Sequence, residues 1–363
     1  MNETGVADVN SSLNALPVIL CNGSIPSKED ERIAFQRFCR CFISPPDFFT
    51  TFVELFFNRL FLVISLLGNS LVIVVLQRMK KGSALIRLHT NFLIQNLAIA
   101  DMAVCLLYNL NEIYDKNPNN TTRLTCKFFA GLLFTCLSAS SCLVCFISIE
   151  RFLAVLRPLD FELSKRKATL MVIFSWYYAA LFAIPDFYWI EKMDITFCQS
   201  GVIPICTYKQ QPGTDTIVVS LLSVTATFII PITVIIFSNV SIVKTMVWSK
   251  DSIYYYRGNR GRSMSVASLN SQNLRRRQNA VRIVLLLTLV FVVCSVPYAT
   301  NIVLNILGVA VPMEFISLAY YLMLVNSTAN PFVYSFLSQD FRQACSQLAK
   351  GTIRSVLRLC AAD

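Results

Sequence analysis

Long apolar segments alternate with short polar connections over most of the chain. A helix needs about 20 mostly apolar residues to cross the roughly 30 Å hydrocarbon core of a membrane. Seven segments reach this length, so the pattern predicts an all-α membrane protein, a bundle of seven transmembrane helices. The predicted spans are residues 52–77, 88–114, 126–156, 168–190, 215–247, 279–307 and 312–336.

The polar stretches between and beyond the spans define three regions. We expect residues 1–50 to form an N-terminal tail, residues 51–337 the transmembrane domain, and residues 338–363 a short amphipathic helix and tail on the membrane surface. The longest connection, at about 249–278, is rich in Ser, Arg and Asn. It is predicted to be a flexible loop because it has little apolar surface to bury.

Composition and charge set the class of protein and its orientation. Charged residues make up only 15% of the chain, which argues against a water-soluble domain. The connections after spans 1, 3 and 5 and the C-terminal tail hold 22 of the 32 Lys and Arg residues, so the positive-inside rule predicts that this side is cytoplasmic. The N-terminal side carries a net charge of −4 and is predicted to be extracellular, at the plasma membrane. The basic balance therefore reflects topology and does not indicate nucleic acid as a partner.

Sequence signals for covalent modification agree with this orientation. The predicted extracellular tail contains three glycosylation sequons, at Asn2, Asn10 and Asn22. On the cytoplasmic side, Cys360 or Cys345 is a palmitoylation candidate, with a free thiol as the alternative. Six cysteines fall on the oxidising side, where disulfides persist. They are Cys21, Cys39, Cys41, Cys126, Cys198 and Cys206.

Polar residues inside the apolar spans distinguish among receptors, channels and transporters. Such residues are costly in lipid and are expected to face the bundle interior. Each span carries a distinctive group, in chain order. The groups are Gly68-Asn69, Leu97-Ala-Ile-Ala-Asp101, Glu150-Arg151-Phe152, Trp176, Pro231, Cys294-Ser-Val-Pro297-Tyr298 and Asn330-Pro331-Phe-Val-Tyr334.

This ordered set resembles the rhodopsin-like (class A) G-protein-coupled receptors, and most of all the neuropeptide receptors, over roughly residues 50–345. The resemblance implies a cell-surface receptor that binds an extracellular ligand and activates heterotrimeric G proteins. The inner ends of spans 5 and 6 would move outward on activation. Arrestin, receptor kinases and membrane lipid are the further partners that it implies. A disulfide from Cys126 to the second outer loop is also implied, with Cys206 favoured over Cys198 as the partner.

Three groups of functional residues follow from the resemblance. The first is a set for G-protein coupling, in which Glu150 holds Arg151 in the resting state. The second is a set of conformational switch positions, and the third is a pocket for sodium and water. The coupling set is Glu150, Arg151, Phe152, Pro158 and Leu159; the switch set is Phe291, Pro297, Asn330, Pro331 and Tyr334; the sodium pocket is Asp101, Ser140, Asn326, Ser327 and Asn330.

Three switch positions depart from the family pattern. Ser295 replaces a Trp, Asn239 replaces a Tyr that bonds through water to Tyr334, and Arg277 stands where some members have a Glu that locks onto Arg151. The details of switching are therefore expected to differ here.

The ligand is expected to be a peptide. Leu133 occupies the position where amine receptors carry an Asp, so a monoamine has no counter-ion there. The acidic outer face favours a cationic peptide, and Glu112 could pair with it or, alternatively, with Arg59 inside the protein. The predicted ligand contacts are Glu112, Leu133, Phe134, Tyr298, Asn301, Asn305 and Tyr320.

Other classes of function were also considered. A lipid or small molecule is the alternative ligand. A transporter would show inverted repeats with interrupted helices, which this pattern lacks. The only histidine is His89, and no metalloprotease, phosphate-binding or serine-hydrolase motif occurs, so no enzymatic activity and no resident cofactor other than the sodium ion are expected.

Overall fold

The computed structural model describes most of the predicted transmembrane domain. Its described residues are 48–79, 88–115, 121–156, 163–197, 201–208, 214–257, 264–307, 309, 311–338 and 341–350. Several predicted features lie outside these ranges. They are Asn2, Asn10, Asn22, Cys21, Cys39, Cys41, Pro158, Leu159, Cys198 and Cys360.

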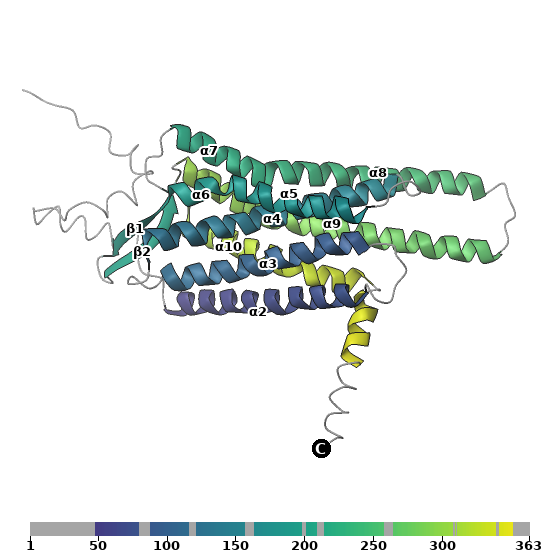
Figure 1. Ribbon diagram of the computed structural model, residues 1–363, viewed down its shortest axis with the longest axis horizontal. Coiled ribbons are helices and arrows are strands. Elements are labelled where there is room, and N and C mark those ends of the chain that lie inside the picture. Colours follow the sequence, from purple (N-terminus) through teal and green to yellow (C-terminus); the bar gives the residue numbers. More distant parts are fainter. Residues whose placement is uncertain are drawn as a thin grey trace, which may run out of the picture.

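Long helices lie side by side in one bundle and account for all seven predicted spans (Figure 1). The fifth span is a continuous run of three elements with a π-helical turn, η3, in its middle. The fourth ends in a short second helix, α6. The helices are α2 (Phe48–Met79), α3 (Leu88–Asp115), α4 (Arg123–Leu156), α5 (Lys165–Phe182), α6 (Ile184–Trp189), α7 (Thr214–Val224), η3 (Thr225–Ile229), α8 (Ile230–Arg257), α9 (Met264–Ile306) and α10 (Met313–Leu337).

Six of these spans are long and apolar enough to cross a membrane on those grounds alone. The seventh, α10, packs against α2, α3 and α9. Its polar stretch from Asn326 to Asn330 lowers its hydropathy, and three of these residues, Ser327, Thr328 and Asn330, are buried inside the bundle. A span surrounded by other helices can carry such residues because they do not face lipid. The predicted all-α membrane bundle is confirmed.

Helix α4 occupies the interior of the bundle and lies against α3, α5 and α8. Its buried face carries several small residues, among them Ser138, Ala139, Ser140 and Ser141. Small side chains allow helix backbones to approach closely, which matters in a membrane because lipid gives apolar helices little reason to associate.

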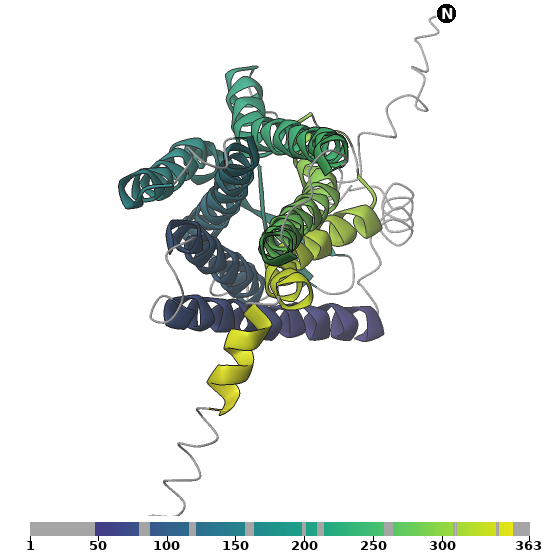
Figure 2. The same ribbon diagram turned by 90° about the vertical axis from the view of Figure 1, so that its right-hand side faces the viewer.

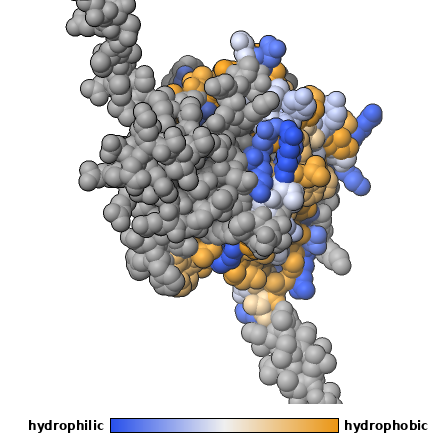
Figure 3. Space-filling view, turned by 90° about the vertical axis from the view of Figure 1, so that its left-hand side faces the viewer, coloured by the Kyte–Doolittle hydropathy of each residue, from blue (hydrophilic) through white to orange (hydrophobic). Residues whose placement is uncertain are grey.

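A two-stranded hairpin caps one end of the bundle, which we call the hairpin end. Strand β1 (Ile190–Phe197) pairs antiparallel with β2 (Gly201–Tyr208), from Ile190 opposite Tyr208 to Phe197 opposite Gly201. Figure 3 views the molecule from this end, where hydrophilic side chains gather beside apolar ones. We call the other end, which carries Arg151, the opposite end.

The hairpin is held on α4 by two contacts. Cys126 of α4 forms a disulfide with Cys206 of β2, which confirms the favoured pairing, and Arg123 of α4 pairs with Glu191 of β1. A third contact holds α6, because the Lys127 ammonium donates a hydrogen bond to the Tyr188 carbonyl at 2.7 Å. Together these contacts fix the connection between the fourth and fifth spans over the start of α4.

The fourth span is divided where the sequence predicted one helix over 168–190. Helix α5 ends at Phe182, and α6 begins at Ile184 with Pro185 in its first turn. Proline has no amide hydrogen and is best tolerated in a helical first turn, where that donor has no intrahelical partner. The α6 helix lies close to α4, since a Cβ on Gly131 would meet the Phe187 ring at 2.6 Å.

The connection predicted at 249–278 is shorter than expected. Helix α8 continues to Arg257 and α9 already begins at Met264. Good helix formers in this stretch, such as Arg, Gln and Leu, allow the spans to extend beyond the apolar segments. The two flanks of 249–278 therefore belong to the helices α8 and α9, and the flexibility of this region stays a prediction.

A further helix, residues 341–350, follows the seventh span and leaves the bundle sideways (Figure 2). Phe341 is buried beside the Tyr334 ring, at 6.2 Å between ring centroids. Cys345 packs against the apolar cluster that contains Tyr334 and Phe341. Burial raises the pKa of its thiol. Acylation of Cys345 or Cys360 remains a prediction.

Replacing Cys126 or Cys206 with Ser is expected to lower thermal stability and the amount of folded receptor, because the bridge restrains the hairpin. Loss of a native disulfide costs about 2–5 kcal/mol in small secreted domains. Melting of the detergent-solubilised protein measures the change. Cys142→Ser, which removes a cysteine that forms no disulfide within the described residues, is the control. Equal melting temperatures for all of these variants would contradict the structural role of the bridge.

Candidate functional site

Asp101 is the centre of a polar cluster in the middle of the bundle. Its side chain is fully buried. Ser140 of α4 donates to one carboxylate oxygen at 3.0 Å, and Asn330 of α10 donates to the other at 2.6 Å. Ser65 of α2 donates to the Asp101 carbonyl at 3.3 Å. Residues of α4 and α10 thus converge on the Asp101 carboxylate of α3, while α2 contacts the Asp101 backbone.

Asn69 extends the cluster from α2 to α10. Its amide donates to the Ser65 hydroxyl at 3.2 Å and to the Ser327 carbonyl at 3.1 Å. The Asn69 side-chain oxygen and the Ser327 hydroxyl are buried without a hydrogen-bond partner among the described residues. Of the predicted sodium pocket, Asp101, Ser140, Ser327 and Asn330 gather here, whereas no hydrogen bond joins Asn326 to Asp101 in the described part of the chain.

The glycine before Asn69 makes this contact between α2 and α10 possible. A Cβ on Gly68 would meet the Pro331 ring at 2.9 Å. Any larger side chain at position 68 would therefore push the first and seventh spans apart. The Gly68-Asn69 pair acts as a unit, in which glycine permits the close approach and asparagine bridges it.

Arg151 lies at the opposite end, near the C-terminus of α4. Its Nε is 3.1 Å from the Glu150 carboxylate. Thr90 of α3 donates a hydrogen bond to the other Glu150 oxygen at 3.1 Å. Glu150 is buried, so the ion pair holds Arg151 against the helix. Next to it, the Phe152 ring contacts the Phe237 ring of α8 at 6.1 Å.

The departures at the switch positions have structural counterparts. Asn239 of α8 donates a hydrogen bond to Thr288 of α9 at 2.6 Å, so it joins the fifth and sixth spans directly.

Phe291 is buried between α4 and α8 in a cluster that includes Leu143 and Ile235. Ser295 is buried. Pro297 and Pro331 lie inside α9 and α10, and Tyr334 is buried near the end of α10. The Arg277 side chain lies outside the described part of the structure.

An aromatic cluster fills the hairpin-end half of the bundle and contains several predicted ligand contacts. Phe134 meets Phe228 of η3 at 6.2 Å between centroids, and Phe228 meets Tyr298 at 6.0 Å. Tyr298 in turn meets Tyr320 at 5.5 Å. Leu133 packs in the same cluster, and Asn301 is buried one turn beyond Tyr298. Asn305 is exposed and donates to the Asn301 carbonyl at 2.8 Å.

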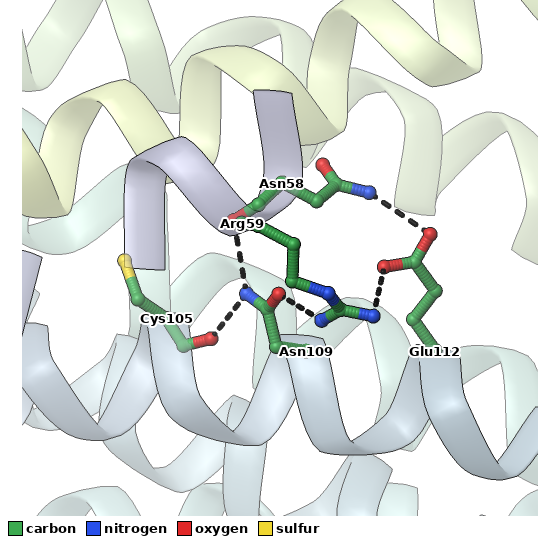
Figure 4. Close-up of polar contacts among 5 residues, drawn as sticks. All are labelled: Asn58, Arg59, Cys105, Asn109 and Glu112. Atoms are coloured by element: carbon green, nitrogen blue, oxygen red, sulfur yellow. Dashed lines mark hydrogen bonds and ion pairs between the residues drawn. The ribbon is translucent and has the colours of Figure 1, made fainter. Parts of the chain in front are cut away.

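Glu112, also a predicted ligand contact, has a partner inside the protein. The Arg59 guanidinium lies 3.6 Å from its carboxylate, and the Asn58 amide donates to it at 3.0 Å (Figure 4). Arg59 also donates to the Asn109 side chain, whose amide donates to the Cys105 and Asn58 carbonyls at 2.8 and 3.3 Å. The internal pair left open by the sequence is present. A ligand-binding role for Glu112 stays a prediction.

Tyr108 and Phe228 contact predicted ligand residues but were not identified from the sequence. The Tyr108 ring lies 5.6 Å from the Tyr320 ring, measured between centroids. Phe228 belongs to the π-helical turn, and its ring lies between those of Phe134 and Tyr298. Asp186, which was not identified either, is buried in α6.

Comparison with known proteins agrees with this arrangement. The family described as 7 transmembrane receptor (rhodopsin family) matches residues 68–334. The mouse thyrotropin-releasing hormone receptor is 22% identical over 309 residues, covering 78% of this chain and 76% of that receptor. The human neuropeptide Y receptor type 2 is 25% identical over 299 residues, covering 78% and 72%. The octopamine receptor beta-1R of Drosophila melanogaster is 22% identical over 333 residues, covering 85% and 64%.

All three relatives are receptors by name and none is an enzyme. The matched region runs from Gly68 at the approach of α2 to α10 through to Tyr334 near the end of α10, so it contains the polar cluster around Asp101 except for Ser65. The chain is a multi-pass membrane protein, and it belongs to the rhodopsin family of seven-transmembrane receptors.

Proposed function

We propose that this receptor binds an extracellular peptide between the hairpin and the aromatic cluster and transmits the signal to a heterotrimeric G protein. The choice of a peptide over a small amine as the ligand rests on the residue Leu133. It is buried in the apolar cluster and offers no counter-ion to a small amine at the position where amine receptors carry an Asp. Two of the similar receptors are named for peptides, thyrotropin-releasing hormone and neuropeptide Y.

The hairpin supports a peptide in a second way. Strands β1 and β2 are fixed over α4 by the disulfide and by the Arg123–Glu191 pair. A rigid outer rim lowers the entropic cost of binding a chain molecule, since less of the receptor must become ordered. The net charge of −4 on the outer segments would also draw a basic peptide toward this rim.

The proposed orientation places the hairpin end outside the cell, at the plasma membrane, and Arg151 inside. It rests on the excess of Lys and Arg in the connections at the Arg151 end. In this orientation Glu150, Arg151 and Phe152 would meet the G protein, and outward movement of the inner ends of the fifth and sixth spans would expose them. Arrestin, receptor kinases and inner-leaflet lipid would act at the same side.

We also propose a sodium ion beside Asp101 in the resting receptor. The donor set fits a hard cation, because it offers a carboxylate, the Ser140 and Ser327 hydroxyls and the Asn69 amide oxygen. The last two oxygens are buried without a partner among the described residues. A bound cation would neutralise Asp101 inside an apolar bundle, where an isolated charge is very costly.

The proposed ligand class is tested by a screen of the receptor in transfected cells. A library of extracellular peptides, a panel of monoamines and a panel of lipids are compared by agonist-stimulated nucleotide exchange. We expect a peptide to act at the lowest concentration. If a monoamine or a lipid is the potent agonist instead, the peptide assignment is wrong while the receptor assignment stands.

Arg151→Ala should abolish agonist-stimulated nucleotide exchange without reducing the amount of receptor at the surface. Glu150→Gln is the matched variant: it keeps an oxygen for the Thr90 hydrogen bond but removes the ion pair, so basal exchange should rise. Surface level is measured with an antibody to an N-terminal epitope on intact cells. Full signalling by Arg151→Ala would refute the coupling role, and staining only after permeabilisation would reverse the orientation.

The receptor in nanodiscs should melt a few degrees higher in sodium chloride than in choline chloride, because a ligand that binds only the folded state stabilises it. Asp101→Asn should remove the difference, whereas Glu191→Gln, a carboxylate at the hairpin end, should keep it. The sodium site is excluded if the unmodified receptor melts at the same temperature in both salts.

A further inference from the structure

The π-helical turn η3 leaves one carbonyl of the fifth span without a backbone donor. In a regular helix the Ala226 carbonyl would accept from the amide of Ile230, four residues later. That amide donates instead to the Thr225 carbonyl. The next amide along the chain would be at position 231, but Pro231 has no amide hydrogen. Both donors that a helical backbone could offer to Ala226 are therefore missing.

The Tyr178 hydroxyl of α5 supplies the missing donor. It donates a hydrogen bond to the Ala226 carbonyl at 2.9 Å, and Ala226 is buried. Inside a membrane no water can replace a lost partner, so an unsatisfied carbonyl there is costly. The Tyr178 ring is held in turn by the rings of Phe174 and Phe182 on its own helix, at 5.7 and 4.7 Å between centroids. The fourth span thus completes the hydrogen bonding of the fifth.

This bond favours the π turn over a regular helix. In a regular helix Ile230 would satisfy the Ala226 carbonyl, so the Tyr178 hydroxyl would contribute less. A contact that is stronger in one of two arrangements shifts the balance toward that arrangement. The turn is also anchored from the third span, because the Thr227 hydroxyl donates to the Ser138 hydroxyl of α4 at 3.2 Å.

The turn decides which side of α7 meets the bundle. Ile217 and Leu221 pack against the apolar cluster that contains Phe134 and Tyr298, while Leu222 is 58% exposed and faces outward. A regular helix would hold one residue fewer at the turn. With α8 fixed, each residue of α7 would then take the place of its predecessor, so Leu222 would occupy the place of Leu221.

We propose that Tyr178 is a positioning residue for ligand recognition: its hydroxyl holds the π turn and thereby determines which side chains of α7 line the aromatic cluster. The role in recognition rests on the function proposed above, whereas the hold on the turn does not. Tyr178 acts entirely through the backbone of η3 and needs no contact with the ligand.

Tyr178→Phe tests the hold on the turn, because it keeps the ring and removes only the hydroxyl. A spin label on Leu222→Cys reports oxygen accessibility in the full-length receptor in nanodiscs, after subtraction of the signal from receptor without the added cysteine. Oxygen concentrates in lipid, so the label is accessible in the unmodified receptor. In Tyr178→Phe its accessibility should fall toward that of a label on Leu221→Cys.

Two controls accompany this measurement. A label on Val240→Cys, an exposed position of α8 beyond the turn, should keep its accessibility. Tyr177→Phe, which removes the hydroxyl of an exposed tyrosine on the same helix, should leave the label at position 222 unchanged. Unchanged accessibility at position 222 in Tyr178→Phe would overturn the proposal.

A double-mutant cycle separates the hydrogen bond from simple packing. Pro231→Ala restores an amide that can donate to the Ala226 carbonyl, so Tyr178→Phe should lower the melting temperature less in this background than in the unmodified receptor. An equal loss in both backgrounds would mean that Tyr178 only packs. If Tyr178→Phe alone does not fold, folding in the Pro231→Ala background supports the proposal and failure in both backgrounds refutes it.

Failure of this inference can be told from failure of the proposed function, since neither measurement needs a ligand. If the cell screen finds a peptide agonist but the label at position 222 does not move in Tyr178→Phe, the positioning role is wrong and the peptide receptor stands. If the label moves but no peptide acts, Tyr178 holds the turn and the ligand belongs to another class.

Discussion

The buried carboxylate of Asp101 is the constraint around which the transmembrane bundle is organised. Apolar helices in a lipid solvent have little intrinsic reason to associate in one arrangement. A carboxylate in the same surroundings must find hydrogen-bond donors, because the cost of leaving it unsatisfied exceeds the energy of any single packing contact. Ser140 and Asn330 supply these donors, and Ser65 and Asn69 extend the network. This network thereby fixes the rotation and the axial position of four helices, α2, α3, α4 and α10.

The contacts on either side of this network differ in kind. At the hairpin end, covalent and ionic links cross between elements, from Cys126 to Cys206 and from Arg123 to Glu191. At the opposite end the main ion pair joins neighbours on one helix, Glu150 and Arg151. The cross-helix links described there include a neutral hydrogen bond, from Asn239 to Thr288. Helix ends joined by neutral hydrogen bonds separate at lower cost than those joined by a disulfide.

Much of this structure could be predicted from residue type and order. The seven spans follow from hydropathy, and Asp101 with Asn330 follows from the rule that polar residues in a membrane face inward. The Cys126–Cys206 pairing came from family resemblance, since the sequence itself offered six cysteines on one side. The spans and the inward-facing polar residues share a cause, because each is set by the polarity of the residues themselves.

Other features depend on how helices are rotated against each other, and sequence periodicity could not decide them. The Arg59–Glu112 pair was one of two options, because Glu112 could instead have faced a ligand. Tyr108 was missed because its role depends on the ring of Tyr320, more than 200 residues away in the chain. The helical flanks of the connection at 249–278 were missed because a polar composition was taken to exclude a helix, although such residues can continue one that has already begun.

The π-helical turn at Thr225–Ile229 has a consequence for the register of the fifth span. A π turn holds one residue more than an α turn, so every residue before it is rotated by about 100° from where an uninterrupted helix would place it. Positions in α7 that are assigned by counting back from Pro231 therefore fall on the wrong face. The side that meets the bundle is given by Ile217, Leu221 and Val224. An alignment without a gap at this turn would direct the wrong side chains of α7 toward the ligand.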